Sequence, residues 1–412
     1  MTRVDDRLVH AAALAGLPGI TPVRLVSLMA GFDPVEAWTA LVHGRHPADP
    51  DRRFAAAARA TDPAEVGERY RRAGFEILLP GAERYPSMLV DDPGAPAVLF
   101  AHGDPSVLEG RPRVAIVGTR SATPYGRQVA ADLGRDLAFS GVVVVSGLAL
   151  GIDGAAHAGA LQVAEGEGAP PVAVVGTGLD VAYPSSNARI WDGVVARGVV
   201  LSESPLGTQP LPKVFPARNR IIAALSDVVV VVESHHGGGS LYTVDAAARR
   251  GIPVAAVPGS VRSRASEGTN GLLVDGCIPV RDATDVMVAI SLARSGRDAP
   301  APAQQAATLV AARGKRAMPP VGKAGASPGV ANGPLTPGIT EKGRTVLGAV
   351  DDTPTLFETI LLRTGLAIAE AAQGCDELVA SGRLLAGAGW WSKQQPGRSG
   401  AGEAAVAPTN RG

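Results

Sequence analysis

The chain has 412 residues, which is enough for two or three domains with sizeable cores. Lysine plus arginine and aspartate plus glutamate each number 39, so the net charge does not point to nucleic acid and any basic surface has to be local. The two cysteines, Cys277 and Cys375, are far apart in the sequence, which excludes a disulfide framework or a cysteine-based zinc site. No signal peptide is predicted, and no apolar run approaches the ~20 residues that span a bilayer, so a soluble, cytoplasmic protein is expected.

Residues 1–80 form a predicted small helical domain. The segment LPGITPVRLVSLMAGFDPVEAW places apolar residues at helical spacing. It resembles a helix-hairpin-helix unit, in which a Gly-x-Gly turn offers backbone N–H groups to DNA phosphates. The turn here reads Gly19-Ile20-Thr21, so the second glycine is missing. Contact with DNA and a purely structural helical module both remain open.

Between residues 81 and 293, short apolar runs alternate with helical segments. The run from Val228 to Val232 holds five consecutive valines, which is typical of a strand buried on both faces. Strands that alternate with helices in this way predict a parallel sheet wound on both sides. The predicted strands are 114–118, 142–146, 172–176, 199–203, 228–232, 253–259 and 278–280.

Glycine-rich turns follow several of these strands at their carboxyl ends, where the ligands of such sheets bind. A strand, a glycine turn and a helix start bring backbone N–H groups and the positive end of a helix dipole together, which favours a phosphate. A basic segment with an aromatic ring lies nearby in the sequence, and this combination suits a single nucleic-acid strand. The turns contain Gly118, Gly147, Gly176–Gly178 and Gly237–Gly239, and the basic segment contains Lys213, Phe215, Arg218, Asn219 and Arg220.

The remainder of the chain is predicted to contain a linker, a small domain and a tail. Residues 294–340 are rich in proline, glycine and alanine without periodicity, which is typical of a flexible linker. Residues 341–395 read as three helices and a short hairpin, a winged-helix-like plan. The candidate recognition helix carries Glu370 and further acids but no cation, which favours a protein-facing or regulatory role over DNA contact. Residues 396–412 are predicted to be disordered.

The strand-end motifs together resemble the bacterial DNA-processing protein A family, also called DprA or Smf. The resemblance covers about residues 85–290. It implies an extended Rossmann-like fold that binds single-stranded DNA, forms a homodimer through that domain and hands the DNA to a RecA-type recombinase. It further implies a mediator that is not an enzyme, needs no cofactor and acts in natural transformation or DNA repair. The matching motifs are GTRSATPYG (118–126), SGLALGIDGAAHAGAL (146–161), VVGTGLDVAYPSSN (174–187), LSESPLGTQPLPKVFPARNRIIAALS (201–226), GGSLYTVDAA (238–247), VPGS (257–260) and EGTNGLLVDG (267–276).

The predicted DNA-binding residues are Gly118, Thr119, Arg120, Gly147, Lys213, Phe215, Arg218, Asn219, Arg220, Gly238, Gly239 and Ser240. Arg120 can hold a phosphate with both guanidinium arms, beside the backbone N–H groups of Gly118 and Thr119, or pair with a neighbouring carboxylate. Phe215 can stack on a base, a contact worth roughly 1–3 kcal/mol, or pack in the core. One arginine of the following helix is expected to point inward and hold the loop. Phosphate contacts carry no sequence information, so little base preference is expected.

Three alternatives are weaker on the residues alone. Asp153 and His157 stand four residues apart, but without a third ligand they are better interpreted as a buried structural pair, and no metal site is predicted. An NAD-dependent enzyme is disfavoured because TRSATPYG lacks the GxGxxG spacing. A nucleotide phosphoribohydrolase of the lysine-decarboxylase-like group shares the sheet and a glycine loop. The loop here has no carboxylate until Asp245, so general acid–base help is missing.

Overall fold

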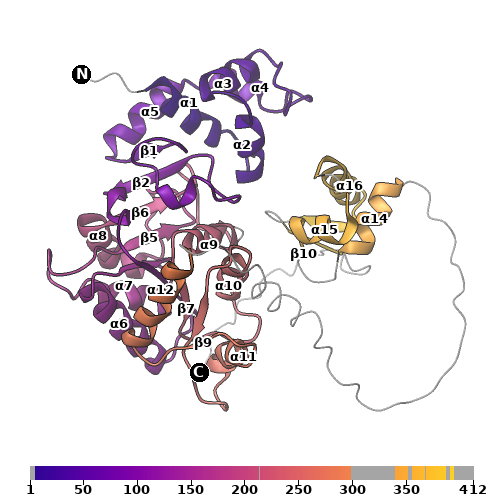
Figure 1. Cartoon of the computed structure of the whole chain (residues 1–412). Coiled ribbons are helices and arrows are strands. Elements are labelled where there is room, and N and C mark those ends of the chain that lie inside the picture. Colours follow the sequence, from indigo (N-terminus) through magenta and orange to yellow (C-terminus); the bar gives the residue numbers. More distant parts are fainter. Residues whose placement is uncertain are drawn as a thin grey trace, which may run out of the picture. The chain divides into compact units, whose positions relative to one another are not determined.

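The computed structural model describes residues 5–212, 214–297, 339–350, 355–366, 368–386 and 390–393. The chain divides into two compact units, Met1–Pro319 and Pro320–Gly412, and each is described by itself (Figure 1). Most of the predicted linker and the whole predicted tail lie outside the described residues.

A nine-stranded sheet forms the centre of the first unit. Its strands are β1 (Glu76–Leu78), β2 (Leu99–Gly103), β3 (Arg113–Val117), β4 (Val143–Ser146), β5 (Val172–Val175), β6 (Val199–Ser202), β7 (Val228–Val231), β8 (Val254–Ala256) and β9 (Ile278–Pro279). Their order in the sheet is β1-β2-β6-β5-β4-β3-β7-β8-β9. Neighbours from β6 to β9 pair in parallel, whereas β1 with β2 and β2 with β6 pair antiparallel.

The predicted seven strands correspond to β3 to β9, and the predicted mostly parallel, Rossmann-like α/β sheet is confirmed. β1 and β2 lie outside the predicted set. β2 buries only the first three of its five residues, and its partner β6 is about a hundred residues away, with Phe100 opposite Ser202. A strand of this kind is defined by its pairing more than by its own side chains.

Helices cover both faces of the sheet. They are α6 (Pro124–Phe139), α7 (Ile152–Ala160), α8 (Ala188–Arg197), α9 (Val214–Ala224), α10 (Leu241–Ala248), α11 (Glu267–Val274) and α12 (Ala283–Arg297). Successive strand side chains point to opposite faces. Val143 and Val145 of β4 therefore join the core beneath α9, α10 and α11, whereas Val144 joins the core beneath α6, α7 and α12. The parallel strands are buried on both faces, which explains their nearly continuous valine runs.

The parallel strands all end on one rim of the sheet, here called the carboxyl edge. The chain proceeds from β3 through β4 and β5 to β6 on one side, and then crosses to β7, β8 and β9 on the other. The direction of winding therefore changes between β3 and β7. Ligands of open α/β sheets bind at such a switch point, outside the carboxyl ends of the strands.

Five short helices precede the sheet: α1 (Asp6–Ala15), α2 (Pro22–Met29), α3 (Pro34–Val42), α4 (Ala55–Ala60) and α5 (Pro63–Arg72). They share a core with β2 and α8, in which the rings of Tyr70 and Phe100 stack 4.7 Å apart. The turn between α1 and α2 contains Gly19 at φ 79°, a conformation that glycine adopts readily. Among the described residues no single helix is long and apolar enough to cross a bilayer, and the bent pair α2 with α3 meets those criteria together.

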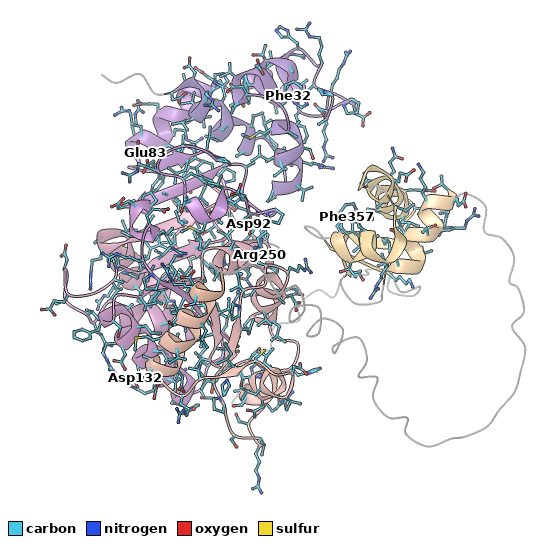
Figure 2. The ribbon with its side chains drawn as sticks, in the orientation of Figure 1. Phe32, Glu83, Asp92, Asp132, Arg250 and Phe357 are labelled. Atoms are coloured by element: carbon cyan, nitrogen blue, oxygen red, sulfur yellow. The ribbon has the colours of Figure 1, made fainter. Side chains whose placement is uncertain are left out.

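The segment between β1 and β2 is tied to the helices on one face of the sheet. Asp92 of this segment forms a two-pronged ion pair with Arg250, which follows α10, at 2.6 and 2.8 Å (Figure 2). Both side chains are largely buried. A planar guanidinium that meets both carboxylate oxygens gives a geometrically specific contact, so this pair fixes the position of α10 against the antiparallel end of the sheet.

The described residues of the second unit form three helices and a small sheet. They are α14 (Glu341–Ala349), β10 (Thr355–Leu356), α15 (Phe357–Thr364), α16 (Ile368–Ala380), β11 (Leu384–Ala386) and β12 (Trp390–Lys393), with the strands antiparallel in the order β10-β12-β11. Val346, Ile360 and Leu378 lie in its core. Two acids of α16 have partners within the unit: Glu370 pairs with Lys342, and Glu377 accepts from Thr340. The winged-helix assignment of this unit stays a prediction.

Candidate nucleic-acid interface

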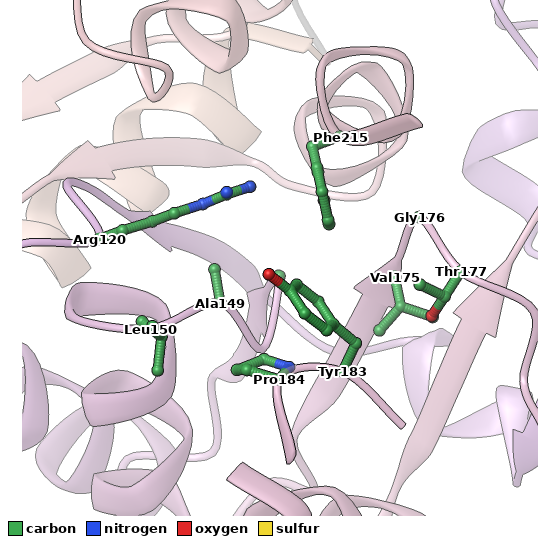
Figure 3. A pocket seen from close by; sticks show the side chains of 10 residues that line it. Arg120, Ala149, Leu150, Val175, Gly176, Thr177, Tyr183, Pro184 and Phe215 are labelled. Carbon is green, nitrogen blue, oxygen red and sulfur yellow. The ribbon is translucent and has the colours of Figure 1, made fainter. Parts of the chain in front are cut away.

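The loops after β3, β4 and β5 meet the first turn of α9 around a small cavity at the carboxyl edge (Figure 3). The cavity has a volume of about 80 Å³. Its lining residues are Arg120, Gly147, Ala149, Leu150, Val175, Gly176, Thr177, Tyr183, Pro184 and Phe215. Two predicted glycine turns, at Gly147 and Gly176, and the aromatic ring of the predicted basic segment thus meet in one place.

An arginine and two aromatic rings gather at this cavity. The Cζ atom of Arg120 lies 4.4 Å from the centroid of the Phe215 ring, and the Tyr183 ring lies 5.8 Å from that of Phe215 at an angle of 35°. Figure 3 shows the three side chains reaching into the same space from three different segments. Arg120 is exposed, and Tyr183 and Phe215 are accessible in part. A phosphate and a planar base can therefore reach them from solvent, which disfavours the alternative of Phe215 as a core residue.

The strand-end cradle expected for a phosphate is already filled by a carboxylate of the protein. The N–H of Gly147 donates to Asp153 at 3.1 Å, and the N–H of Thr119 donates to the carbonyl of Glu233 at 2.8 Å. A backbone N–H group that already has a buried acceptor is not available to a ligand. The expectation that the backbone N–H groups of Thr119 and Gly147 bind DNA phosphates is therefore corrected, because in this structure they position the site. Gly118 stays a predicted contact.

Arg218 also acts inside the protein. Its side chain is buried, and its Nη1 donates to the carbonyl of Gly147 at 2.8 Å and to the carbonyl of Val174. Burial lowers the pKa of Arg218 to about 10, and the nearby negative charge of Asp153 opposes that shift. Burial likewise raises the pKa of Asp153, with Arg218 opposing. These two charges hold the first turn of α9, which carries Phe215, above the ends of β4 and β5.

Arg220 has an internal partner as well. Its two terminal nitrogens each lie 2.7 Å from one carboxylate oxygen of Glu203, and both side chains are largely buried. The sequence predicts that one arginine of α9 points inward, and the structure shows that two do. Arg218 and Arg220 therefore leave the set of candidate DNA contacts and join the residues that position α9.

The loop between β7 and α10 is the second predicted cradle. Gly239 is exposed at its tip, and the side-chain nitrogen of Asn219 lies 3.3 Å from the carbonyl of Gly239. The hydroxyl of Ser240 is buried and donates to that of Ser234 at 2.9 Å. The N–H of Gly238 donates to a carbonyl of the same loop at 3.0 Å. Asn219 and Gly239 thus remain candidates for contact with DNA, whereas Gly238 and Ser240 shape the loop.

Two residues complete the comparison with the sequence-based set. Lys213 lies outside the described residues. Tyr183 is absent from the predicted set although it lines the cavity beside Phe215. The signal that could have found it is its place in VAYPSSN, directly after a glycine turn at a strand end, since an aromatic residue there faces the carboxyl edge.

Asp153 and His157 bind different groups of the protein. Asp153 accepts the backbone N–H group described above, and Nε2 of His157 donates to the carbonyl of Val172 at 3.0 Å. His157 is fully buried, and this burial lowers its pKa to about 4. The pair is therefore structural, as interpreted from the sequence. Within the described ranges no group of three or more His, Cys, Asp or Glu side chains could hold a metal ion.

The buried imidazole of His157 should make the fold sensitive to acid. In the unfolded chain a histidine has a pKa near 6.5, and in the fold that of His157 is about 4. The stabilisation that neutral His157 gives to the fold is therefore fully present above about pH 6.5 and is lost as the pH falls toward 4. The free energy of unfolding should fall by about 3 kcal/mol in all. Urea unfolding at pH 7.5 and 4.5 should show that loss for the natural protein and a smaller one for His157→Gln. Equal losses in both proteins would contradict the assignment.

Comparison with known proteins agrees with this architecture. The family model described as DNA recombination-mediator protein A matches residues 76–291. The DNA processing protein DprA of Streptococcus pneumoniae is 39% identical over 236 residues, which are 55% of this chain and 82% of that protein. DprA of Bacillus subtilis is 38% identical over 217 residues, covering 53% and 72%. An X-ray structure of DprA from Streptococcus pneumoniae matches with a TM-score of 0.59 and 32% identity, over 70% of this chain and 98% of that one. The chain therefore belongs to the DNA recombination-mediator protein A family, the DprA/Smf family that its sequence motifs resemble.

Proposed function

We propose that this protein binds single-stranded DNA along the carboxyl edge and acts there as a recombination mediator rather than as an enzyme. The observation that carries the proposal is the exposed group of Arg120, Phe215 and Tyr183 at the mouth of the cavity. Non-specific binding of a single strand needs cations for its phosphates and aromatic faces for its bases. The position of this group near the change in winding direction is where such sheets bind their ligands.

The wider role follows from the family and is part of the same proposal. A member of the DNA recombination-mediator protein A family is expected to deliver the bound strand to a RecA-type recombinase in the cytoplasm, during natural transformation or DNA repair. We further propose a homodimer formed through the first unit. Light scattering of the full chain tests the dimer. Filament formation by a recombinase on DNA coated with a single-strand-binding protein, with and without this protein, tests the delivery.

Binding to a fluorescently labelled thymidine oligonucleotide tests the proposed function directly. We expect tight binding, and the logarithm of the association constant should fall linearly with the logarithm of the salt concentration. Each neutralised phosphate of a single strand contributes about −0.7 to that slope. Unlabelled single strands of different composition should compete about equally, since phosphate contacts and stacking carry little sequence information. Absence of binding at low salt would overturn the proposal.

A phosphoribohydrolase is the enzymatic rival, and the cavity does not favour it. Ligand pockets for small molecules commonly enclose about 300–1,000 Å³, whereas this cavity has about 80 Å³. Its lining residues include no carboxylate, so they do not supply the acidic residue that would assist cleavage of a glycosidic bond. Incubation with AMP and measurement of released ribose phosphate test this alternative, and we expect none above background.

A further inference from the structure

Several segments of the carboxyl edge carry no acidic residue, although the loop after β5 contains the exposed Asp180. Four segments that lie there, 118–127, 211–220, 235–242 and 258–266, contain no aspartate or glutamate. They contain seven lysines and arginines, two in the first segment, three in the second and two in the last, although the full sequence has equal numbers of basic and acidic residues. Arg218 and Arg220 are neutralised from within. Among the described residues of these segments, Arg120, Arg127, Arg262 and Arg264 remain, and their charges favour an anion beside them.

Hydrogen bonds join the cavity to the segment after β8, here called the distal loop (258–266). Asn219, one helical turn from Phe215 in α9, contacts the carbonyl of Gly239 at 3.3 Å. In the same glycine loop, the ring nitrogen Nδ1 of His235 lies 3.1 Å from the carbonyl of Arg264 in the distal loop. The helices α9, α10 and α11 follow one another on the same face of the sheet (Figure 1). The surface is therefore continuous from Phe215 through the glycine loop to the distal loop.

A second connection runs along the other side of the edge. Tyr125, the second residue of α6, follows Arg120 by five residues, and its hydroxyl donates to the carbonyl of Pro258 at 3.3 Å. The Arg120 loop and the distal loop are thus held together at this point. Protein surface therefore connects the cavity to the distal loop on this side of the glycine loop as well.

The distal loop and its neighbours expose the groups that a nucleic-acid strand requires. Arg262 and Arg264 are exposed, and neither guanidinium forms an ion pair with a carboxylate in the part of the chain that the structure describes. Tyr125 and Tyr242 are 53% and 40% exposed, and His236 is exposed between them in the sequence. Their exposed rings offer faces on which bases can stack. Rings and unpaired cations together suit stacked bases and phosphates.

We infer that a single DNA strand bound at the Phe215 cavity continues over the glycine loop to a distal subsite formed by Tyr125, His236, Tyr242, Arg262 and Arg264. The subsite takes the phosphodiester backbone and one or more stacked bases, without preference for sequence. The inference rests on the proposed function, because it extends the same strand along the same edge. Its consequence is a second group of phosphate contacts that only an oligonucleotide long enough to leave the cavity can reach.

The test compares the natural protein with the double variant R262Q/R264Q in the full chain. With a thymidine oligomer of about 30 nucleotides, the variant should bind about tenfold more weakly, and its salt slope should be shallower by about 1.4, which is two phosphates at about 0.7 each. With an oligomer of about 5 nucleotides, the length held by a small single-strand site, the two proteins should bind alike. R262K/R264K, which keeps both charges, should restore the slope.

A matched control removes two charges from the opposite rim of the sheet. Arg111 precedes β3 and Arg135 lies in the last turns of α6, and both are exposed or partly exposed. R111Q/R135Q should leave the affinity and the slope for the long oligomer as in the natural protein. If R262Q/R264Q behaves like this control while the natural protein binds DNA, the distal subsite is wrong and the proposed function stands. If the natural protein does not bind the oligomer at all, the proposed function itself fails.

Discussion

Replacing Phe215 with alanine is expected to weaken binding of a thymidine oligonucleotide by roughly 5- to 160-fold, which corresponds to the roughly 1–3 kcal/mol of one base stacked on an aromatic ring. Arg120→Ala should weaken binding of the oligonucleotide by a similar factor, because it removes an exposed partner for a phosphate. The two side chains touch, with the Arg120 Cζ atom 4.4 Å from the ring centroid. Their contributions should therefore not be independent, and the double variant should lose less than the product of the single losses.

Fluorescence anisotropy titration at fixed salt measures these affinities. The control is Phe139→Ala with Arg135→Ala at the far end of α6, where Phe139 is 68% exposed. This double variant removes the same side-chain types from the rim where the strands begin, so its affinity for the oligonucleotide should match that of the natural protein. Thermal unfolding followed by circular dichroism should be the same for all variants, since exposed substitutions usually change stability by about 0.5 kcal/mol or less. Unchanged DNA affinity in both Phe215→Ala and Arg120→Ala would show that the DNA binds elsewhere.

The sheet could be predicted from the sequence because its parallel strands are buried on both faces. Runs such as Val228–Val231 have no polar residue to place toward solvent, and they recur between helical segments. The antiparallel extension by β1 and β2 could not be predicted in the same way. β2 ends in an exposed glycine, and only its pairing with β6 identifies it as a strand. That pairing is a long-range property, which local pattern does not contain.

The candidate site could be predicted in place but not in detail. The rule that ligands meet the carboxyl ends of strands brings Gly147, Gly176 and Phe215 together, and they do line one cavity. The sequence does not say which acceptor satisfies which N–H group, because that depends on how each helix is rotated against the sheet. In the structure the carboxylate of Asp153 accepts the N–H of Gly147, at the position where the sequence predicts a phosphate. For the same reason two of the predicted DNA-binding arginines have opposite environments: Arg120 is exposed and Arg218 is buried.

The position of Phe215 depends on a buried group of charges around Arg218. The guanidinium of Arg218 is held by carbonyls at the ends of β4 and β5, and the carboxylate of Asp153 provides the opposite charge nearby. Such a group is costly to break from one side, because the remaining charge stays buried without its counterpart. The structure thus assigns Arg218 to the support of the stacking ring, whereas an arginine in direct contact with DNA would contribute little to folding.

Arg218→Met distinguishes these two roles. The substitution keeps the apolar stem and removes the charge, so Asp153 loses its counter-charge and the free energy of unfolding in urea should fall by about 3–5 kcal/mol. Arg262→Met removes an exposed arginine of the same edge and should change stability by about 0.5 kcal/mol or less. Combining Arg218→Met with Asp153→Asn should recover part of the loss, because no uncompensated charge then remains buried. If Arg218→Met is as stable as the natural protein but binds the oligonucleotide as poorly as Phe215→Ala, Arg218 contacts the DNA itself and its internal role is refuted.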